Sequence, residues 1–152
     1  SWDEVTRDTS YIGKSVFQAR RNAGDVPTGG TIYWWNLLRG ADSNTVYLPM
    51  YNKEDVVIGY DRIIFLKEGF YSITTLNNSN SNGGALRMTM KINGNTVLEA
   101  NHDPDPNEPA TCNLHTHWNA KKGDYLQLAV NVGTAQGADG PDYRNLISIS
   151  RL

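Results

Sequence analysis

The sequence lacks several features that would assign it to a familiar class. Its single cysteine, Cys112, allows neither an internal disulfide nor a cluster of thiolate metal ligands. No apolar run approaches the roughly 18 residues of a membrane-spanning helix, and the first residues do not resemble a secretory signal. There is no basic excess, because 14 Lys and Arg face 16 Asp and Glu, a formal net charge of -2. We therefore expect a soluble chain, assembled in a reducing cytoplasm, whose partners are neither membranes nor nucleic acids.

Catalytic motifs are missing as well. The sequence contains no Gly-x-Ser-x-Gly and no His-Glu-x-x-His. Gly13-Lys14-Ser15 looks like the end of a phosphate-binding loop, but that motif needs a glycine at position 8, where Asp8 stands. We therefore expect a protein that is not an enzyme and that has no cofactor.

Turn-forming and aromatic residues are plentiful, and apolar residues recur with a period of two. The 152 residues include 14 Gly, 16 Asn, 8 Tyr and 4 Trp. Alternation of apolar and polar residues is typical of a strand with one buried face, and Asn93-Gly94 is a strong hairpin signal. The alternating segments are 70–75, 86–92, 114–119, 125–132 and 146–152. They predict an all-β fold of two antiparallel sheets, in which loops of 8 to 10 residues cross between the sheets.

The first 40 residues differ from the rest. They hold three of the four tryptophans and carry five Lys and Arg against four Asp and Glu, whereas the remainder carries nine against twelve. We therefore predict an N-terminal β-arm over residues 1–40 and a main domain over residues 41–152, with a boundary near 39–43.

Four segments of the main domain resemble the jelly roll of tumour necrosis factor and of the globular head of complement. They are 65–73, 90–94, 114–128 and 145–152. The resemblance implies a jelly roll of about ten strands that associates as a homotrimer around a three-fold axis. The large aromatic residues Phe70, Trp118 and Tyr125 are candidates for the trimer interface.

The N-terminal segment resembles a second structure, the small β-module of chitin-binding domains and of phage fibre ends. The resemblance rests on Trp2 and on residues 11–19, 22–28 and 33–38. The module usually has Gly-Asp before its strand, whereas this chain has Gly13-Lys14-Ser15. Together the two resemblances imply a component of a virus or phage particle.

Aromatic residues of the arm are candidates for anchoring to a partner. In a strand, neighbouring side chains point to opposite faces, so one of Trp34 and Trp35 is expected to be exposed. An exposed tryptophan suits a protein hot spot, and we favour that interpretation over stacking on a sugar ring. The candidate anchors are Trp2, Tyr11, Tyr33, Trp34 and Trp35.

Two segments offer metal-ligating side chains. His115 and His117 share one strand face and could bind one ion, although neutral structural histidines are commoner. Asp103, Asp105 and Glu108 could bind calcium, but the prolines between them favour a stiff, solvated loop. We therefore predict no metal site.

The leading functional hypothesis is a non-enzymatic capsid decoration, or cement, protein. It would sit as a trimer on the exterior of a virion assembled in the host cytoplasm, with the arm anchored to neighbouring subunits and the major capsid protein as partner. The short chain without a shaft repeat favours decoration over a tail fibre. The alternative is a receptor-binding or carbohydrate-binding module of a fibre tip or adhesin, with host-surface glycans as partners.

Overall fold

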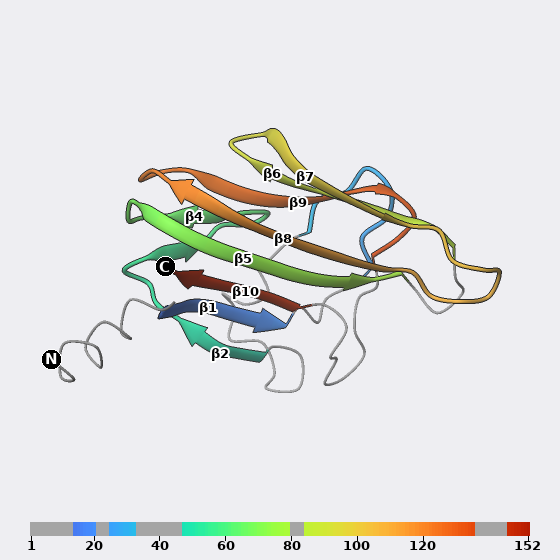
Figure 1. The fold of residues 1–152 in the computed structure, drawn as a ribbon, viewed down its shortest axis with the longest axis horizontal. Coiled ribbons are helices and arrows are strands. Elements are labelled where there is room, and N and C mark those ends of the chain that lie inside the picture. Colours follow the sequence, from blue (N-terminus) through green and yellow to red (C-terminus); the bar gives the residue numbers. More distant parts are fainter. Residues whose placement is uncertain (1–13, 21–24, 33–46, 80–83, 136–145) are drawn as a thin grey trace, which may run out of the picture.

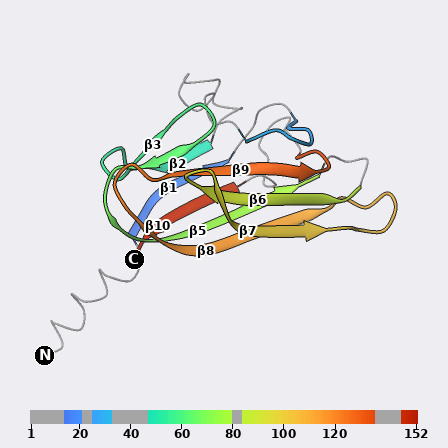
Figure 2. The ribbon, with the colours of Figure 1, turned by 90° about the horizontal axis from the view of Figure 1, so that it is seen from above.

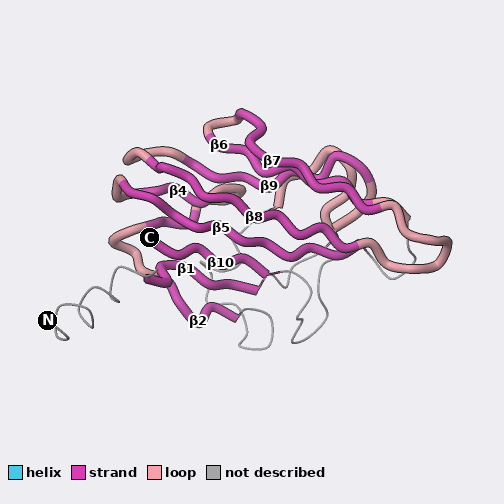
Figure 3. Tube along the Cα trace, in the orientation of Figure 1, coloured by secondary structure: helices cyan, strands magenta, loops and turns pink. Residues whose placement is uncertain are grey.

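The structure is a computed structural model that describes residues 14–20, 25–32, 47–79, 84–135 and 146–152, without the side chains of 20 and 47–49. All regular elements within these ranges are β-strands (Figure 3). None of the described residues forms a helix of the length and apolarity needed to cross a membrane. The strands are β1 (Lys14–Arg20), β2 (Tyr47–Tyr51), β3 (Val56–Ile58), β4 (Ile63–Phe65), β5 (Gly69–Asn78), β6 (Leu86–Ile92), β7 (Asn95–His102), β8 (Thr111–Ala120), β9 (Tyr125–Val132) and β10 (Leu146–Arg151).

The strands form two five-stranded sheets that pack face to face (Figure 1, Figure 2). One sheet has the order β2-β1-β10-β5-β8 and the other the order β3-β4-β9-β6-β7. Every pairing is antiparallel. This confirms the predicted fold class, a two-sheet antiparallel jelly roll.

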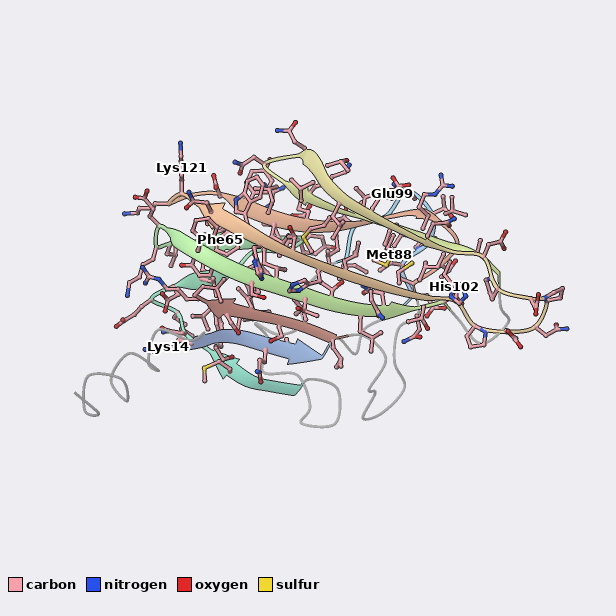
Figure 4. The ribbon with its side chains drawn as sticks, viewed as in Figure 1. Lys14, Phe65, Met88, Glu99, His102 and Lys121 are labelled. Atoms are coloured by element: carbon pink, nitrogen blue, oxygen red, sulfur yellow. The ribbon has the colours of Figure 1, made fainter. Side chains whose placement is uncertain are left out.

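The core lies between the sheets and follows from the alternation seen in the sequence. In β5 the side chains of Tyr71, Ile73 and Thr75 are buried, whereas the residues between them are not. Phe65 and Met88 approach the same interior from the other sheet (Figure 4). The Phe65 and Tyr71 rings lie 4.8 Å apart, so aromatic packing joins the two layers.

Two turns explain why particular residues stand where they do. Asn93 and Gly94 both have positive φ, 53° and 80°, which is the backbone of a tight hairpin turn between β6 and β7. Gly133, at the end of β9, also has positive φ, and a Cβ there would lie 2.1 Å from the carbonyl oxygen of Ala85. Glycine is therefore required at position 133.

Strand β1 changes the predicted division of the chain. It lies inside the first sheet, paired with β10 on one side and β2 on the other. Its residues Val16, Phe17 and Ala19 are buried in the common core. The segment 25–32 also adds to the fold, because Ile32 N donates to the Leu128 carbonyl and Val130 N to that of Gly30. The jelly roll thus begins before residue 41, where we predicted its start, and the predicted boundary at 39–43 lies outside the described residues.

Candidate functional site

On the outward side of the β2-β1-β10-β5-β8 sheet, the described side chains carry no carboxylate, ammonium or guanidinium group; Arg20 also holds an outward position, in register with Leu146, but its side chain is not among those described. Residues that alternate with the buried positions of these strands point away from the core. Among those whose side chains the structure describes there is no Asp, Glu, Lys or Arg. We call this surface the uncharged face. It comprises Met50, Gln18, Leu146, Ser148, Ser150, Phe70, Ser72, Thr74, Leu76, Asn113, His115, His117 and Asn119.

One row of this face crosses all five strands. Gln18 is in register with Met50 on one side and with Ser148 on the other. Ser148 is in register with Thr74, which in turn is in register with His115. Apart from Met50, which lies on the edge strand, the row consists of polar side chains that carry no carboxylate or ammonium group. Such a row can be covered by a protein surface without burying an unpaired ion.

The outward side of the other sheet carries charge. Arg87 on β6 and Glu99 on β7 form an ion pair of 3.5 Å, and Glu99 points away from the first sheet (Figure 4). Near β9, Arg62 contacts Asp61 at 2.9 Å and lies 4.3 Å from the centre of the Tyr125 ring. The hydrogen bond from Arg62 lowers the pKa of Asp61, and desolvation opposes it only in part. This side therefore suits exposure to water, in contrast to the uncharged face.

The three predicted trimer-interface residues do not share one surface. Phe70, 53% exposed, lies on the uncharged face, in register with Asn119. Trp118 points inward from β8, packs against the core and donates from Nε1 to Asp124 Oδ2 at 3.3 Å. Tyr125 belongs to β9 in the other sheet.

The predicted anchors of the arm are not placed. Trp2, Tyr11, Tyr33, Trp34 and Trp35 all lie outside the described residues.

The two histidines of β8 lie together as the sequence predicted. His115 and His117 are exposed on the uncharged face, with ring centroids 5.2 Å apart. The acidic segment with Asp103, Asp105 and Glu108 is exposed beyond His102, at the end of β7 (Figure 4). No three His, Cys, Asp or Glu side chains of the described part of one chain are grouped closely enough to hold a metal ion.

Cys112 is a core residue. Its Sγ is buried and donates to the Leu86 carbonyl at 3.1 Å, and burial raises the pKa of the thiol. A protonated, buried thiol is a poor nucleophile, so this cysteine serves packing.

The sequence alone does not predict the uncharged face as a whole. The sequence shows Ser72 and Thr74, and likewise Ser148 and Ser150, as polar residues that alternate with apolar ones in two predicted strands. Their adjacency depends on β10 lying beside β5, which the sequence pattern does not contain.

The fold is similar to known structures although the sequence is not. No protein-family model and no curated protein matches the chain. The crystal structure of murine APRIL at pH 5.0 superposes with a TM-score of 0.69 at 9% identity, over 91% of this chain and 98% of that one. The structure of Eiger TNF from S. frugiperda gives 0.63 at 12% identity, over 91% and 92% of the two chains. At these identities the likeness shows the fold, a TNF-like jelly roll.

Proposed function

We propose that this protein is a non-enzymatic binding module that assembles as a homotrimer through the uncharged face. The observation that carries the proposal is the row Met50, Gln18, Ser148, Thr74 and His115, which crosses five strands without an ion. Protein interfaces are depleted of charged residues at their centres, because a buried charge must be paired. The trimer that the sequence resemblance implies gives the expected occupant, a second and a third copy of this chain.

The contrast between the two sheets supports burial of the uncharged face rather than of the other sheet. The Arg87–Glu99 and Arg62–Asp61 pairs keep the β6, β7 and β9 side hydrated. An assembly that buried this side would have to desolvate these ions, whereas the described side chains of the uncharged face carry no carboxylate, ammonium or guanidinium group. The charged sheet and the loops at the ends of the sandwich then remain available to a larger partner.

A single charge at the centre of the face tests the proposal. Ser148→Glu places a carboxylate between Gln18 and Thr74. The matched control is Thr96→Glu, which puts the same group on an exposed position of β7 opposite Lys91. Mass by light scattering is expected to be three times the chain mass for the wild type and for Thr96→Glu, and one chain mass for Ser148→Glu.

Two results would overturn the proposal. A wild-type protein that stays monomeric at high micromolar concentration contradicts self-assembly. A Ser148→Glu variant that remains trimeric places the interface elsewhere. Circular dichroism of both variants checks that each is folded as the wild type is.

For the biological setting, we propose the capsid exterior of a virus, with the major capsid protein as the larger partner. The support is the sequence resemblance of the N-terminal segment to phage fibre modules. Mass spectrometry of purified particles tests it, because a decoration protein is present in many copies per particle. Its absence from particles would contradict the setting while leaving the assembly proposal intact.

A further inference from the structure

His115 and His117 lie close enough together to serve as two ligands of one metal ion. They are two residues apart on β8, and both rings stand on the uncharged face. The ring centroids are 5.2 Å apart and the ring planes are at 79°. Two imidazoles that each bind a tetrahedral zinc through one nitrogen at about 2.0–2.1 Å have centroids about 5 Å apart. The two rings thus already have the separation that a shared ion requires.

The neighbouring strand fixes one of these rings. Thr74 Oγ1 lies 2.8 Å from His115 Nδ1, across the β5–β8 pairing. When Nδ1 carries the proton and donates to this hydroxyl, Nε2 is left with its lone pair for a metal. Such a hydrogen bond from the ring nitrogen that does not bind metal is the usual support of a histidine ligand. Ser72, opposite His117, adds no charge that would repel a cation.

Among the described residues of one chain the pair is an incomplete site. The described residues provide no third His, Cys, Asp or Glu close to it. His102, the remaining histidine, lies at the end of β7, and its Nδ1 accepts a hydrogen bond from Thr111 N. Zinc usually takes at least three protein ligands, so the described residues of one chain do not complete a zinc site by themselves.

We propose that His115 and His117 bind a divalent transition-metal ion of the zinc class, and that the same histidines of neighbouring copies complete the site. The inference rests on the proposed function, because assembly through the uncharged face is what brings the pairs together. Imidazole suits zinc, nickel and copper, and each shared ion would link the copies that supply its ligands.

The experiment measures zinc binding and assembly on the same samples. Isothermal titration with Zn²⁺ gives affinity and stoichiometry, and light scattering gives mass with and without the ion. The assembled wild type is expected to bind fewer than one zinc per chain. His117→Gln abolishes this binding, whereas the matched control His102→Gln binds as the wild type does.

Two further variants separate a metal site from a general surface effect. Thr74→Val keeps the branched shape but removes the hydroxyl beside His115, and lowers the zinc affinity about tenfold. Ser148→Glu, which is designed to prevent assembly, weakens zinc binding although both histidines remain.

The outcomes distinguish this inference from the proposed function. A trimer that binds no zinc, or a His117→Gln variant that binds it normally, overturns the metal site and leaves the assembly intact. A monomer that binds one zinc per chain contradicts both the shared site and the assembly. A chain that assembles only after zinc is added supports the site and contradicts assembly without metal.

Discussion

Asp124 joins two turns that are far apart in the sequence. Its Oδ1 accepts a hydrogen bond from Asn93 Nδ2 at 2.8 Å, and its Oδ2 accepts from Lys121 N at 2.9 Å and from Trp118 Nε1. Burial alone would raise the pKa of this carboxyl, but the hydrogen bonds from Lys121, Asn93 and Trp118 together hold the pKa below its ordinary value. The ionised form of Asp124 therefore stabilises the fold.

Asp124→Asn is expected to lower the free energy of unfolding by about 1 kcal/mol at neutral pH, because an amide replaces an acceptor oxygen with a donor. Because the pKa of Asp124 is lowered in the folded state, its ionised carboxyl stabilises the fold at pH values above the ordinary carboxyl pKa. This stabilisation is lost as the pH falls through the lowered pKa of the folded state. The difference between wild type and variant, measured by urea unfolding, should therefore shrink below pH 4. Asp103→Asn, in an exposed loop, is the control. A difference that persists unchanged at low pH would contradict the role of the charge.

At the scale of elements, strand β1 is part of the jelly roll rather than of a separate N-terminal arm. It supplies Val16 and Phe17 to the core and covers one edge of β10 through six paired positions. Without it, β10 would present unpaired backbone groups along that edge. Residues 14–20 thus act as a structural strand of the jelly roll, and only residues 1–13 precede the described strands.

Two truncations test this division. Deletion of residues 1–13 leaves all ten described strands and is expected to retain a cooperative thermal transition. Deletion of residues 1–40 removes β1; loss of the buried Phe17 side chain alone costs about 3–5 kcal/mol, a large part of the about 5–15 kcal/mol that stabilises a domain. The longer deletion should therefore lack a cooperative thermal transition by circular dichroism. A cooperative melt of the longer deletion near the wild-type temperature would restore the boundary at residue 40.

Local patterns in the sequence predicted local structure well. The alternation in 70–75, 86–92 and 125–132 and the Asn93-Gly94 turn correspond to β5, β6, β9 and the β6–β7 hairpin. Alternation shows that one side of a strand is buried, but it does not show which strands are neighbours, since pairing between distant segments is set by packing. The position of β10 between β1 and β5 could therefore not be predicted, nor could the row of Gln18, Ser148 and Thr74.

Aromatic size was a poor guide to position. Trp118 follows the buried Leu114 by four residues on β8, and side chains an even number of residues apart point to the same side of a strand, so Trp118 points toward the interior. Tyr125 is held beneath the Arg62 guanidinium on the other sheet. Phe70 differs from both, because it holds an outward position of β5 and lies on the uncharged face.

At the scale of the whole molecule, the two sheets share one core but differ in what they present outside. The β6–β7–β9 side carries ion pairs, whereas the polar groups among the described side chains of the β1–β10–β5–β8 side are hydroxyls, amides and imidazoles. A monomer in water gains nothing from this asymmetry, whereas an assembly gains by burying the neutral side. Folding and assembly should then be linked, because burial of that side stabilises the folded state only when copies are present.

This linkage predicts that stability depends on protein concentration. When assembly stabilises folded chains by mass action, the urea midpoint of the wild type should rise as the protein is made 100-fold more concentrated. The midpoint of Ser148→Glu should stay constant over the same range, and Thr96→Glu should behave as the wild type does, because its carboxylate lies on β7 in the other sheet. Fluorescence of the tryptophans follows each transition. A wild-type midpoint that does not move with concentration would show that the uncharged face contributes nothing to the stability of the folded chain.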